Sequence, residues 1–244
     1  MTRRPAQSPR LRPSHFLCIP LATHTSRPQL QRSLAAFRAH AAATPALGIP
    51  TPTIRPLGTI HLTLGVMDLA TDPAALARAC RLLASVRPAA LLDAVRSEVS
   101  GAALVAPALS ISLTGLHPMH EMGCTSVLYA HPSDSASASA GVLERFCARL
   151  RQVFIDAGLM DSERERALRL HATLVNTVYL PGQGRGRGRG QRVMLDARAA
   201  VDWAADVQWM RNVPVEQVAI CRMGALPVGG EDGEAYVVEA AVRM

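Results

Sequence analysis

The sequence predicts an α+β fold, and three observations lead to that prediction. Segments with the period-two alternation of strands are interleaved with segments of helical period. Some of the predicted strands follow one another directly, as antiparallel neighbours do. A His-x-Thr-Leu tetrad occurs twice, at 61–64 and at 171–174, inside apolar runs that are 110 residues apart. The chain is 49% hydrophobic, so it can bury a sizeable core.

The first half of the chain alternates between predicted strands and helices. Asp72 and Pro73 carry the clearest boundary signal, because Asp is a good N-cap and Pro suits the first helical position. That helix is expected to continue to about Val86. The other elements expected here are a strand at 15–21, a helix at 27–43 that ends before Pro45, the first tetrad strand at 59–67, and a second helical piece after Pro88.

The second half contains more strands. The segment 109–116 is predicted to be a strand because its hydropathy alternates. The segment 123–130 is predicted to be the strand beside it. A Ser-rich loop at 133–141 leads into a helix that runs to about Ala157. The remaining predicted elements are the second tetrad strand at 168–179 and two final strands at 215–225 and 235–244, joined by a turn at 229–234.

Basic charge is concentrated at the beginning of the chain. The chain has no lysine, and residues 1–67 contain eight arginines and no acidic residue. Arginine binds phosphate groups well, so the excess favours a nucleic-acid partner. A GC-rich genome is the alternative explanation for the missing lysines. Without lysine, Walker-type phosphate loops and Schiff-base chemistry are excluded.

Cysteine usage and hydropathy indicate an intracellular protein that does not span a membrane. The five cysteines are scattered, are odd in number and form no CxxC pair, so neither a disulfide framework nor a zinc knuckle is expected. A reducing compartment, nucleus or cytoplasm, fits this usage. No apolar run reaches the roughly 18 residues that a transmembrane helix needs.

Two segments are expected to lie outside the packed core. Residues 1–14, rich in Arg and Pro, are predicted to be disordered, with a single domain following at 15–244. A mitochondrial transit peptide is the minor alternative for this start, although its prolines oppose an amphipathic helix. The Gly/Arg stretch at 182–190 is predicted to be a flexible loop. It either contacts RNA backbone through Arg185, Arg187 and Arg189 or is a tolerated surface insertion.

The paired tetrads supply the candidate catalytic residues His61, Thr63, His171 and Thr173. Alternation along a strand places each His and its Thr on one face and the leucines on the other. Two imidazoles on opposite sides of a phosphate can act as base and acid, because imidazole titrates near neutral pH. The threonine hydroxyls can donate to phosphate oxygens as charge builds. The alternative is two unrelated core histidines. No metal or cofactor is required.

Other polar residues are weaker candidates. His117 and His120 form a His-x-x-His that lacks zinc spacing on a helix, and Pro118 favours a loop. Asn176 is expected either to touch substrate or to cap a loop. His15, His24, His40 and His131 are expected on the surface or in loops.

The tetrads and their flanks resemble the 2H phosphoesterase superfamily, the 2′,5′-RNA ligase-like proteins. The strings HFLCIPL, IHLTLGVMDL, LHATLVNT and VEQVAICRMGA are similar to the branch shared by the A-kinase anchoring protein central region and a subunit of the activating signal cointegrator complex. The resemblance runs from about residue 15 to the C-terminus. It implies a two-lobed, pseudo-symmetric fold with antiparallel-rich sheets, flanking helices and a central cleft.

The resemblance also implies a function. It is a metal-independent RNA phosphodiesterase that acts on a 2′,3′-cyclic phosphate or a 3′-terminal linkage, with His61, Thr63, His171 and Thr173 at the family's catalytic positions. The expected partner is RNA or a nucleotide with such a phosphate. The alternative is a non-catalytic nucleotide- or RNA-binding module of a transcription or repair complex. The cointegrator subunit carries a KH domain before this region, and the 14 residues here leave no room for one, which departs from that analogy.

Overall fold

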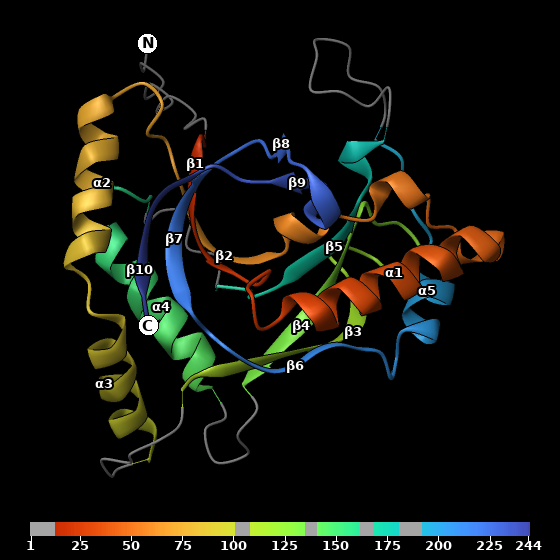
Figure 1. The fold of residues 1–244 in the computed structure, drawn as a ribbon, viewed down its shortest axis with the longest axis horizontal. Helices are drawn as coiled ribbons and strands as arrows, with labels where there is room; N and C mark the ends of the chain where they lie inside the picture. The colour runs from red at the N-terminus through yellow and green to blue at the C-terminus, as the bar shows by residue number, and fades with distance from the viewer. Residues whose placement is uncertain (1–12, 101–107, 135–140, 162–167, 181–191) are drawn as a thin grey trace, which may run out of the picture.

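An antiparallel sheet carries both tetrads at its centre. The computed structural model describes residues 13–100, 108–134, 141–161, 168–180 and 192–244. Within those residues the main sheet has eight strands in the order β10-β7-β1-β2-β5-β4-β3-β6. Their bounds are β1 His15–Pro20, β2 His61–Met67, β3 Ser110–Pro118, β4 Val127–Asp134, β5 Ala172–Asn176, β6 Gln208–Pro214, β7 Gln217–Arg222 and β10 Val238–Arg243. Figure 1 shows that the sheet curls strongly.

The sheet consists of two four-stranded halves that meet between β2 and β5. Each tetrad strand has one antiparallel neighbour in its own half, β1 beside β2 and β4 beside β5. The halves are joined where Leu62 pairs with Ala172. The α+β class and the two-lobed, pseudo-symmetric arrangement predicted from the sequence are therefore confirmed.

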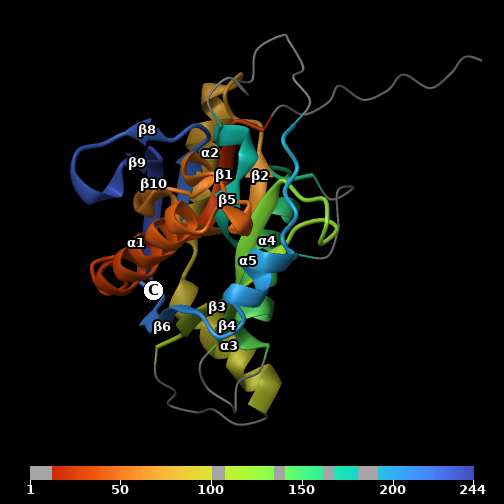
Figure 2. The ribbon, with the colours of Figure 1, turned by 90° about the vertical axis from the view of Figure 1, so that its right-hand side faces the viewer.

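Helices pack on the two sides of the curled sheet. In Figure 1, α2, α3 and α4 lie on one side and α1 and α5 on the other, and Figure 2 shows the same arrangement turned by 90°. The contacts agree, since α2 packs on β10, α4 on β2 and β4, α1 on β6 and α5 on β3. The helices are α1 Arg27–Ala43, α2 Pro73–Ser85, α3 Pro88–Ser100, α4 Val142–Asp156 and α5 Arg198–Trp203.

Local sequence signals explain several helix boundaries. The carboxylate of Asp72 accepts the N–H of Ala74 at 2.8 Å, and Pro73 occupies the first position of α2. This is the capping arrangement that the sequence predicts. The α1 helix covers residues 27–43 as expected, and four of its side chains are buried at a spacing of three or four residues. Their spacing turns one face of α1 toward the core.

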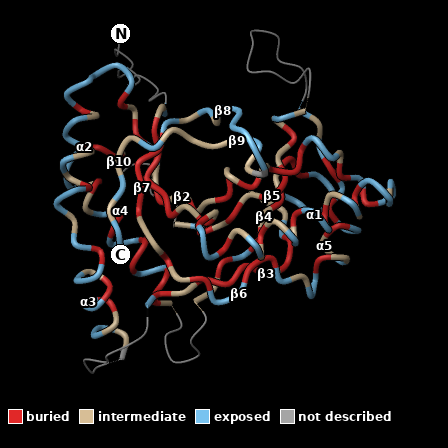
Figure 3. The backbone as a smooth tube through the Cα atoms, in the orientation of Figure 1, coloured by how far each residue is buried: buried red, intermediate tan, exposed pale blue. Residues whose placement is uncertain are grey.

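The core lies between the sheet and these helices and is largely aliphatic. Figure 3 shows the buried residues concentrated along the strands, with exposed residues on the outer faces of the helices. Trp209 of β6 is fully buried, and its indole N–H donates to the carbonyl of Gly115 at 2.6 Å. It meets Phe37 of α1 edge-on at 5.3 Å, which fixes that helix against the second half of the sheet.

The structure corrects several expectations. The strand expected at 123–130 is β4 at Val127–Asp134, so it includes the start of the predicted Ser-rich loop. The second tetrad strand is shorter than 168–179, because β5 begins at Ala172 and a 3₁₀ turn follows at Thr177–Tyr179. His171 therefore lies just before the strand. Strand β6 was not predicted. His15 is buried in β1 at 3% exposure rather than on the surface. Pro118 ends β3 and does not mark a loop at His117, since a proline is tolerated at a strand terminus.

The chain's two ends also contribute to the first half of the sheet. The N–H of Ser14 donates to the carbonyl of Met67, and its hydroxyl accepts the N–H groups of Leu69 and Ala70. A two-stranded hairpin, β8 Leu226–Pro227 with β9 Glu234–Ala235, precedes β10. Among the described helices, none is long and apolar enough to cross a bilayer.

Candidate functional site

The register between β2 and β5 brings the two tetrads together. Leu62 and Ala172 are antiparallel partners, so extending the register by one residue places His61 opposite Thr173 and Thr63 opposite His171. The leucines and Ala172 are buried on the other face, while the two His and two Thr are partly exposed. Burial therefore alternates along both tetrads, and the extended register puts each His across from the Thr of the other tetrad.

The backbone just before β2 fixes the His61 ring. A 3₁₀ turn, η3 Leu57–Thr59, ends two residues earlier, and the carbonyl of Thr59 lies 2.7 Å from Nδ1 of His61. A carbonyl only accepts hydrogen bonds, so Nδ1 carries the proton. The other nitrogen, Nε2, lies 3.0 Å from Oγ1 of Thr63. In the neutral ring Nε2 is a proton acceptor on the face shared with the second tetrad.

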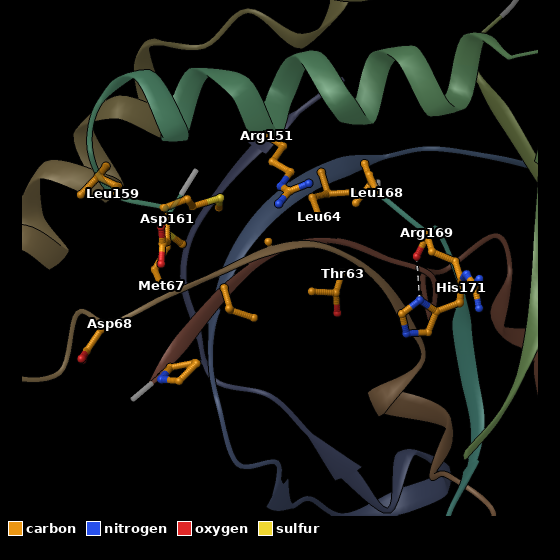
Figure 4. A pocket seen from close by; sticks show the side chains of 14 residues that line it. Thr63, Leu64, Met67, Asp68, Arg151, Leu159, Asp161, Leu168, Arg169 and His171 are labelled. Carbon is orange, nitrogen blue, oxygen red and sulfur yellow. Dashed lines mark hydrogen bonds between the residues drawn. The ribbon is translucent and has the colours of Figure 1, made fainter. Parts of the chain in front are cut away.

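His171 is held in the same way. Its Nδ1 lies 2.8 Å from the carbonyl of Arg169, again two residues before the histidine, as the dashed line in Figure 4 shows. Both rings thus use Nδ1–H for the backbone and leave Nε2 for chemistry. The same hydrogen bond therefore occurs in both halves of the sheet. A hydrogen bond from Nδ1–H to a backbone carbonyl is a common way to orient a catalytic imidazole.

The two rings differ in their surroundings. His61 is enclosed by Phe16, whose ring centroid is 4.8 Å away, and by Tyr236, which meets it edge-on at 5.2 Å. This burial lowers the pKa of His61 to about 4, and His171 and Arg55 lower it further by repulsion, against the opposing effect of the Thr59 carbonyl. His61 is therefore neutral at physiological pH.

His171 faces a larger opening. Its ring meets Tyr129 of β4 edge-on at 5.5 Å. Together with Thr63 it borders a cavity of about 300 Å³, and Figure 4 shows both side chains directed into this space. Arg169 lies at the cavity beside His171, and Arg151 reaches toward it from α4. The cavity has the size of a small-ligand site. Two of the four tetrad side chains, Thr63 and His171, form part of its wall.

A buried arginine lies on the His61 side of the site. Arg55 is only 4% exposed, and its N–H donates to the carbonyl of Leu174 beside Thr173. Its guanidinium lies 3.4 Å from the carboxylate of Glu234 and 3.5 Å above the ring of Tyr179. The ion pair and the cation–π contact compensate for its burial. They hold the Arg55 guanidinium in place next to the tetrads.

Gly58 allows the hairpin to approach this arginine. A Cβ atom at Gly58 would lie 2.5 Å from the carbonyl oxygen of Glu234, so a larger residue would push the hairpin away. The close approach positions Tyr236, the residue after β9, against His61. Burial and the neighbouring Tyr179 raise the pKa of Tyr236 to about 12. Like any tyrosine hydroxyl, that of Tyr236 is protonated at neutral pH and can donate a hydrogen bond.

The remaining residues that the sequence suggested for the site either lie outside the described residues or have a structural role. Arg185, Arg187 and Arg189, in the Gly/Arg stretch at 182–190, lie outside the described residues, as do residues 1–12. Asn176 caps the 3₁₀ turn after β5, because its side-chain oxygen accepts the N–H of Val178 at 3.0 Å. Among the described residues, no group of three or more His, Cys, Asp or Glu side chains could hold a metal ion.

Sequence reasoning did not identify Arg55, Tyr236, Phe16 or Arg151. Arg55, Tyr236 and Arg151 come from segments without a motif of their own, and Phe16 lies in the string HFLCIPL, which carries no chemical signal. All four reach the site only through tertiary packing. A weak signal existed for Arg55, which lies six residues before His61 in a Pro-rich, apolar stretch where an unpaired charge is unusual.

The chain is similar to one protein family over nearly its whole length. The family model of the AKAP7 2′5′ RNA ligase-like domain matches residues 13–243. No significantly similar sequence was found among the curated proteins. Among solved structures, a phosphoesterase is 14% identical, with 95% of this chain and 98% of that chain covered and a TM-score of 0.49.

Two further solved structures are similar to the chain. E. coli LigT complexed with NADP⁺ is 13% identical, with 95% of this chain and 97% of that chain covered and a TM-score of 0.48. A protein of Thermus thermophilus is also 13% identical, with 94% of this chain and 97% of that chain covered and a TM-score of 0.43.

Proposed function

The chain belongs to the AKAP7 2′5′ RNA ligase-like domain family, and we propose that it is a phosphodiesterase that hydrolyses a 2′,3′-cyclic phosphate or a 3′-terminal linkage of RNA. One observation carries the proposal. The Leu62–Ala172 pairing puts two imidazoles and two hydroxyls on one face of adjacent strands, each His opposite the Thr of the other tetrad. A base, an acid and two donors around one point are what phosphodiester hydrolysis needs.

The different surroundings of the two histidines assign their roles. His61 is enclosed and neutral, with Nδ1–H bound to the Thr59 carbonyl, so Nε2 can accept a proton from water. The resulting hydroxide forms a new bond to phosphorus, and the bond from phosphorus to the leaving ribose oxygen breaks. His171, which borders the open cavity, donates a proton from Nε2 to that oxygen. The two imidazoles thus supply both proton transfers.

Charge that builds on the phosphate is neutralised by nearby donors. Thr63 and Thr173 donate hydroxyl hydrogens to the non-bridging oxygens, and the guanidinium of Arg55 lies on the same side as His61. The hydroxyl of Tyr236 is a further donor. Preorganised donors of this kind lower the barrier because they need no reorientation during the reaction.

The cavity beside His171 suits a nucleotide flanking the reacting phosphate. It has a volume of about 300 Å³, and its lining combines apolar side chains with two arginines, Arg151 and Arg169, and with the carboxylates of Asp68 and Asp161 farther along the cavity. Apolar walls accept a nucleobase, and arginine binds phosphate or stacks on a base. RNA with a terminal or cyclic phosphate is therefore the ligand class that we assign to the site.

A substrate screen tests this function. The full chain is incubated with 2′,3′-cyclic nucleotides and with oligoribonucleotides that end in a cyclic phosphate, a 3′-phosphate or a 3′-hydroxyl. Chromatography of the products identifies the position of the phosphate. Product formation that is lost in His61→Ala and in His171→Ala supports the proposal. Measurable affinity without product in the wild-type chain would instead favour the nucleotide- or RNA-binding module.

A further inference from the structure

Two cysteines meet on the face of the sheet that carries the first tetrad. The sulfur atoms of Cys18 in β1 and Cys221 in β7 are 3.7 Å apart, although 203 residues separate them in sequence. In the register of these strands Cys18 is opposite Ala219 and Cys221 is opposite Phe16. The two thiols are therefore diagonal cross-strand neighbours, a separation that side chains can bridge. All five cysteines of the chain are reduced in this structure.

This dithiol is close to the proposed base. Cys18 and Cys221 both line a cavity of about 190 Å³ that His61 and Tyr236 also line. Cys18 is the β1 partner of Thr63 in the sheet register. Phe16, the β1 partner of Cys221, is the residue whose ring lies 4.8 Å from that of His61. Cys18 is thus paired across the sheet with a residue of the first tetrad, Thr63. Cys221 is paired with Phe16, which packs on His61.

We infer that Cys18 and Cys221 form an oxidation site at which hydrogen peroxide or an organic hydroperoxide produces a disulfide, and that this disulfide displaces the first tetrad. Formation of the Cys18–Cys221 disulfide does not depend on whether the chain is a phosphodiesterase. The accompanying loss of turnover rests on that proposed function.

The chemistry balances with the peroxide as the only co-reactant. The sulfur of Cys221 attacks one peroxide oxygen, the O–O bond breaks, and a sulfenic acid and water or an alcohol form. The sulfur of Cys18 then attacks the sulfenic sulfur, an S–S bond forms and water leaves. Two thiols lose two electrons and two protons in total, and the peroxide takes them up.

The environment of the pair assigns which sulfur reacts first. The thiol of Cys18 hydrogen-bonds to Cys221, and this bond lowers the pKa of Cys221 while it raises that of Cys18. Cys221 therefore loses its proton more readily than Cys18, so Cys221 is the attacking sulfur and Cys18 the resolving thiol. Cys147 is the contrasting case: it is fully buried in α4, and burial raises its pKa.

Access restricts the reagents. The two thiols are only 1% and 3% exposed, so they are reached through the cavity rather than from open solvent. A peroxide is small enough for that route, whereas a bulky alkylating reagent is not. Cys124 is exposed on the surface, so a bulky alkylating reagent should label it while leaving the buried pair unlabelled. The pattern of reactivity therefore separates the buried pair from an ordinary surface thiol.

Disulfide formation moves the side chains of Cys18 and Cys221, and we expect the segments of β1 and β7 that carry them to adjust. A disulfide has a bond length of about 2.05 Å, so the sulfurs must approach each other by about 1.7 Å from their present separation. The register of β1 against β2 is already irregular between Leu17 and Cys18, which is where such a movement is most easily absorbed. The displacement passes directly to Thr63 across the strand pair and to Phe16 against His61.

The test uses the full reduced chain treated with one to two equivalents of hydrogen peroxide. Intact mass should fall by two hydrogen atoms, and peptide mapping should join the Cys18 and Cys221 peptides. The NMR signals of the His61 ring should shift, and turnover should fall by about 10²-fold, as it does when a catalytic group is misplaced by about 1 Å. Dithiothreitol should reverse all of these changes.

Three variants make the test selective. Cys18→Ala and Cys221→Ala should keep their turnover and their His61 signals after peroxide treatment, and Cys124→Ala should respond like the wild type. A crosslink that maps elsewhere, or no crosslink in the wild type, overturns the inference, and so does a Cys18–Cys221 disulfide that leaves both the His61 signals and turnover unchanged. If the reduced chain has no turnover, the proposed function fails, while mass and NMR still decide the oxidation site.

Discussion

Oγ1 of Thr63 lies 3.0 Å from Nε2 of His61, so the two polar side chains of the first tetrad are bonded to each other. Because Nδ1–H of His61 is bound to the carbonyl of Thr59, the hydroxyl of Thr63 must be the donor in this pair. A phosphate that enters the site offers this hydroxyl a charged acceptor. The hydroxyl can then turn to the phosphate and leave Nε2 free to take a proton from water.

Removal of either imidazole should therefore abolish most of the turnover. His61→Ala removes the base and His171→Ala removes the acid, and each should lower kcat by about 10²–10⁴-fold. Steady-state hydrolysis of a 2′,3′-cyclic nucleotide measures the effect, and circular dichroism checks that the fold persists. His24→Ala, at an exposed position before α1, is the matched control and should retain full activity. Wild-type rates in either tetrad variant would contradict the mechanism.

The hydroxyls of Thr63 and Thr173 should stabilise the transition state of hydrolysis more than they stabilise bound substrate. Thr63→Val and Thr173→Val keep the shape of the side chain but remove the donor, and each should lower kcat by about 10²-fold with a smaller effect on KM. Thr63→Ser and Thr173→Ser keep the hydroxyl and should retain most of the activity. Equal rates for the Val and Ser variants would show that the hydroxyls do not contact the reacting phosphate.

The central part of the site could be predicted from sequence because it depends on local geometry. Alternation along a strand places His61 and Thr63 on one face without any knowledge of the fold. The same rule applies to Thr173 in β5. The prediction for Thr173 holds although the strand begins at Ala172 and not at residue 168. The fold class followed similarly from interleaved patterns, and the bounds of α1 from its helical period and flanking prolines.

The surroundings of the tetrads could not be predicted, because they depend on long-range packing. Arg55 reaches the site through a backbone hydrogen bond to Leu174, and Tyr236 through the hairpin that packs closely on Gly58. Neither segment has a periodic pattern that would indicate its partner. Strand β6 was missed for a related reason: its sequence, QWMRNVP, has no clear alternation, and its pairing with β3 is irregular.

The rate should depend on pH in a direction that the His61 environment sets. A general base must be unprotonated, so activity should be retained through mildly acidic solution and fall only as the pH drops through about 4, the pKa of His61. An ordinary histidine base would already lose activity below about pH 6.5. The dependence of kcat/KM on pH distinguishes the two cases. A limb near 6.5 on the acidic side would show that His61 is not the base.

The same lowered pKa should make the fold less stable in mild acid. Unfolded His61 takes up a proton near pH 6.5, whereas the folded state resists it down to about pH 4, so stability is lost as the pH falls through this window. The contribution of His61 amounts to about 2 kcal/mol between pH 7.5 and pH 5. Urea unfolding at the two pH values measures it, and His61→Asn should lack this part of the difference. An equal pH response in the variant would rule out His61 as its source.

Enclosure by aromatic rings is the cause that we assign to the low pKa of His61, and Tyr236 allows that cause to be tested. The tyrosine ring meets the imidazole edge-on at 5.2 Å, so Tyr236→Ala opens the pocket to water and should raise the pKa of His61 toward 6.5. Tyr236→Phe keeps the ring and should leave the pKa near 4. NMR titration of the His61 ring measures both variants. If the pKa rose equally in both, the hydroxyl rather than the ring would control the base, and Tyr236 would act through its hydrogen bonds.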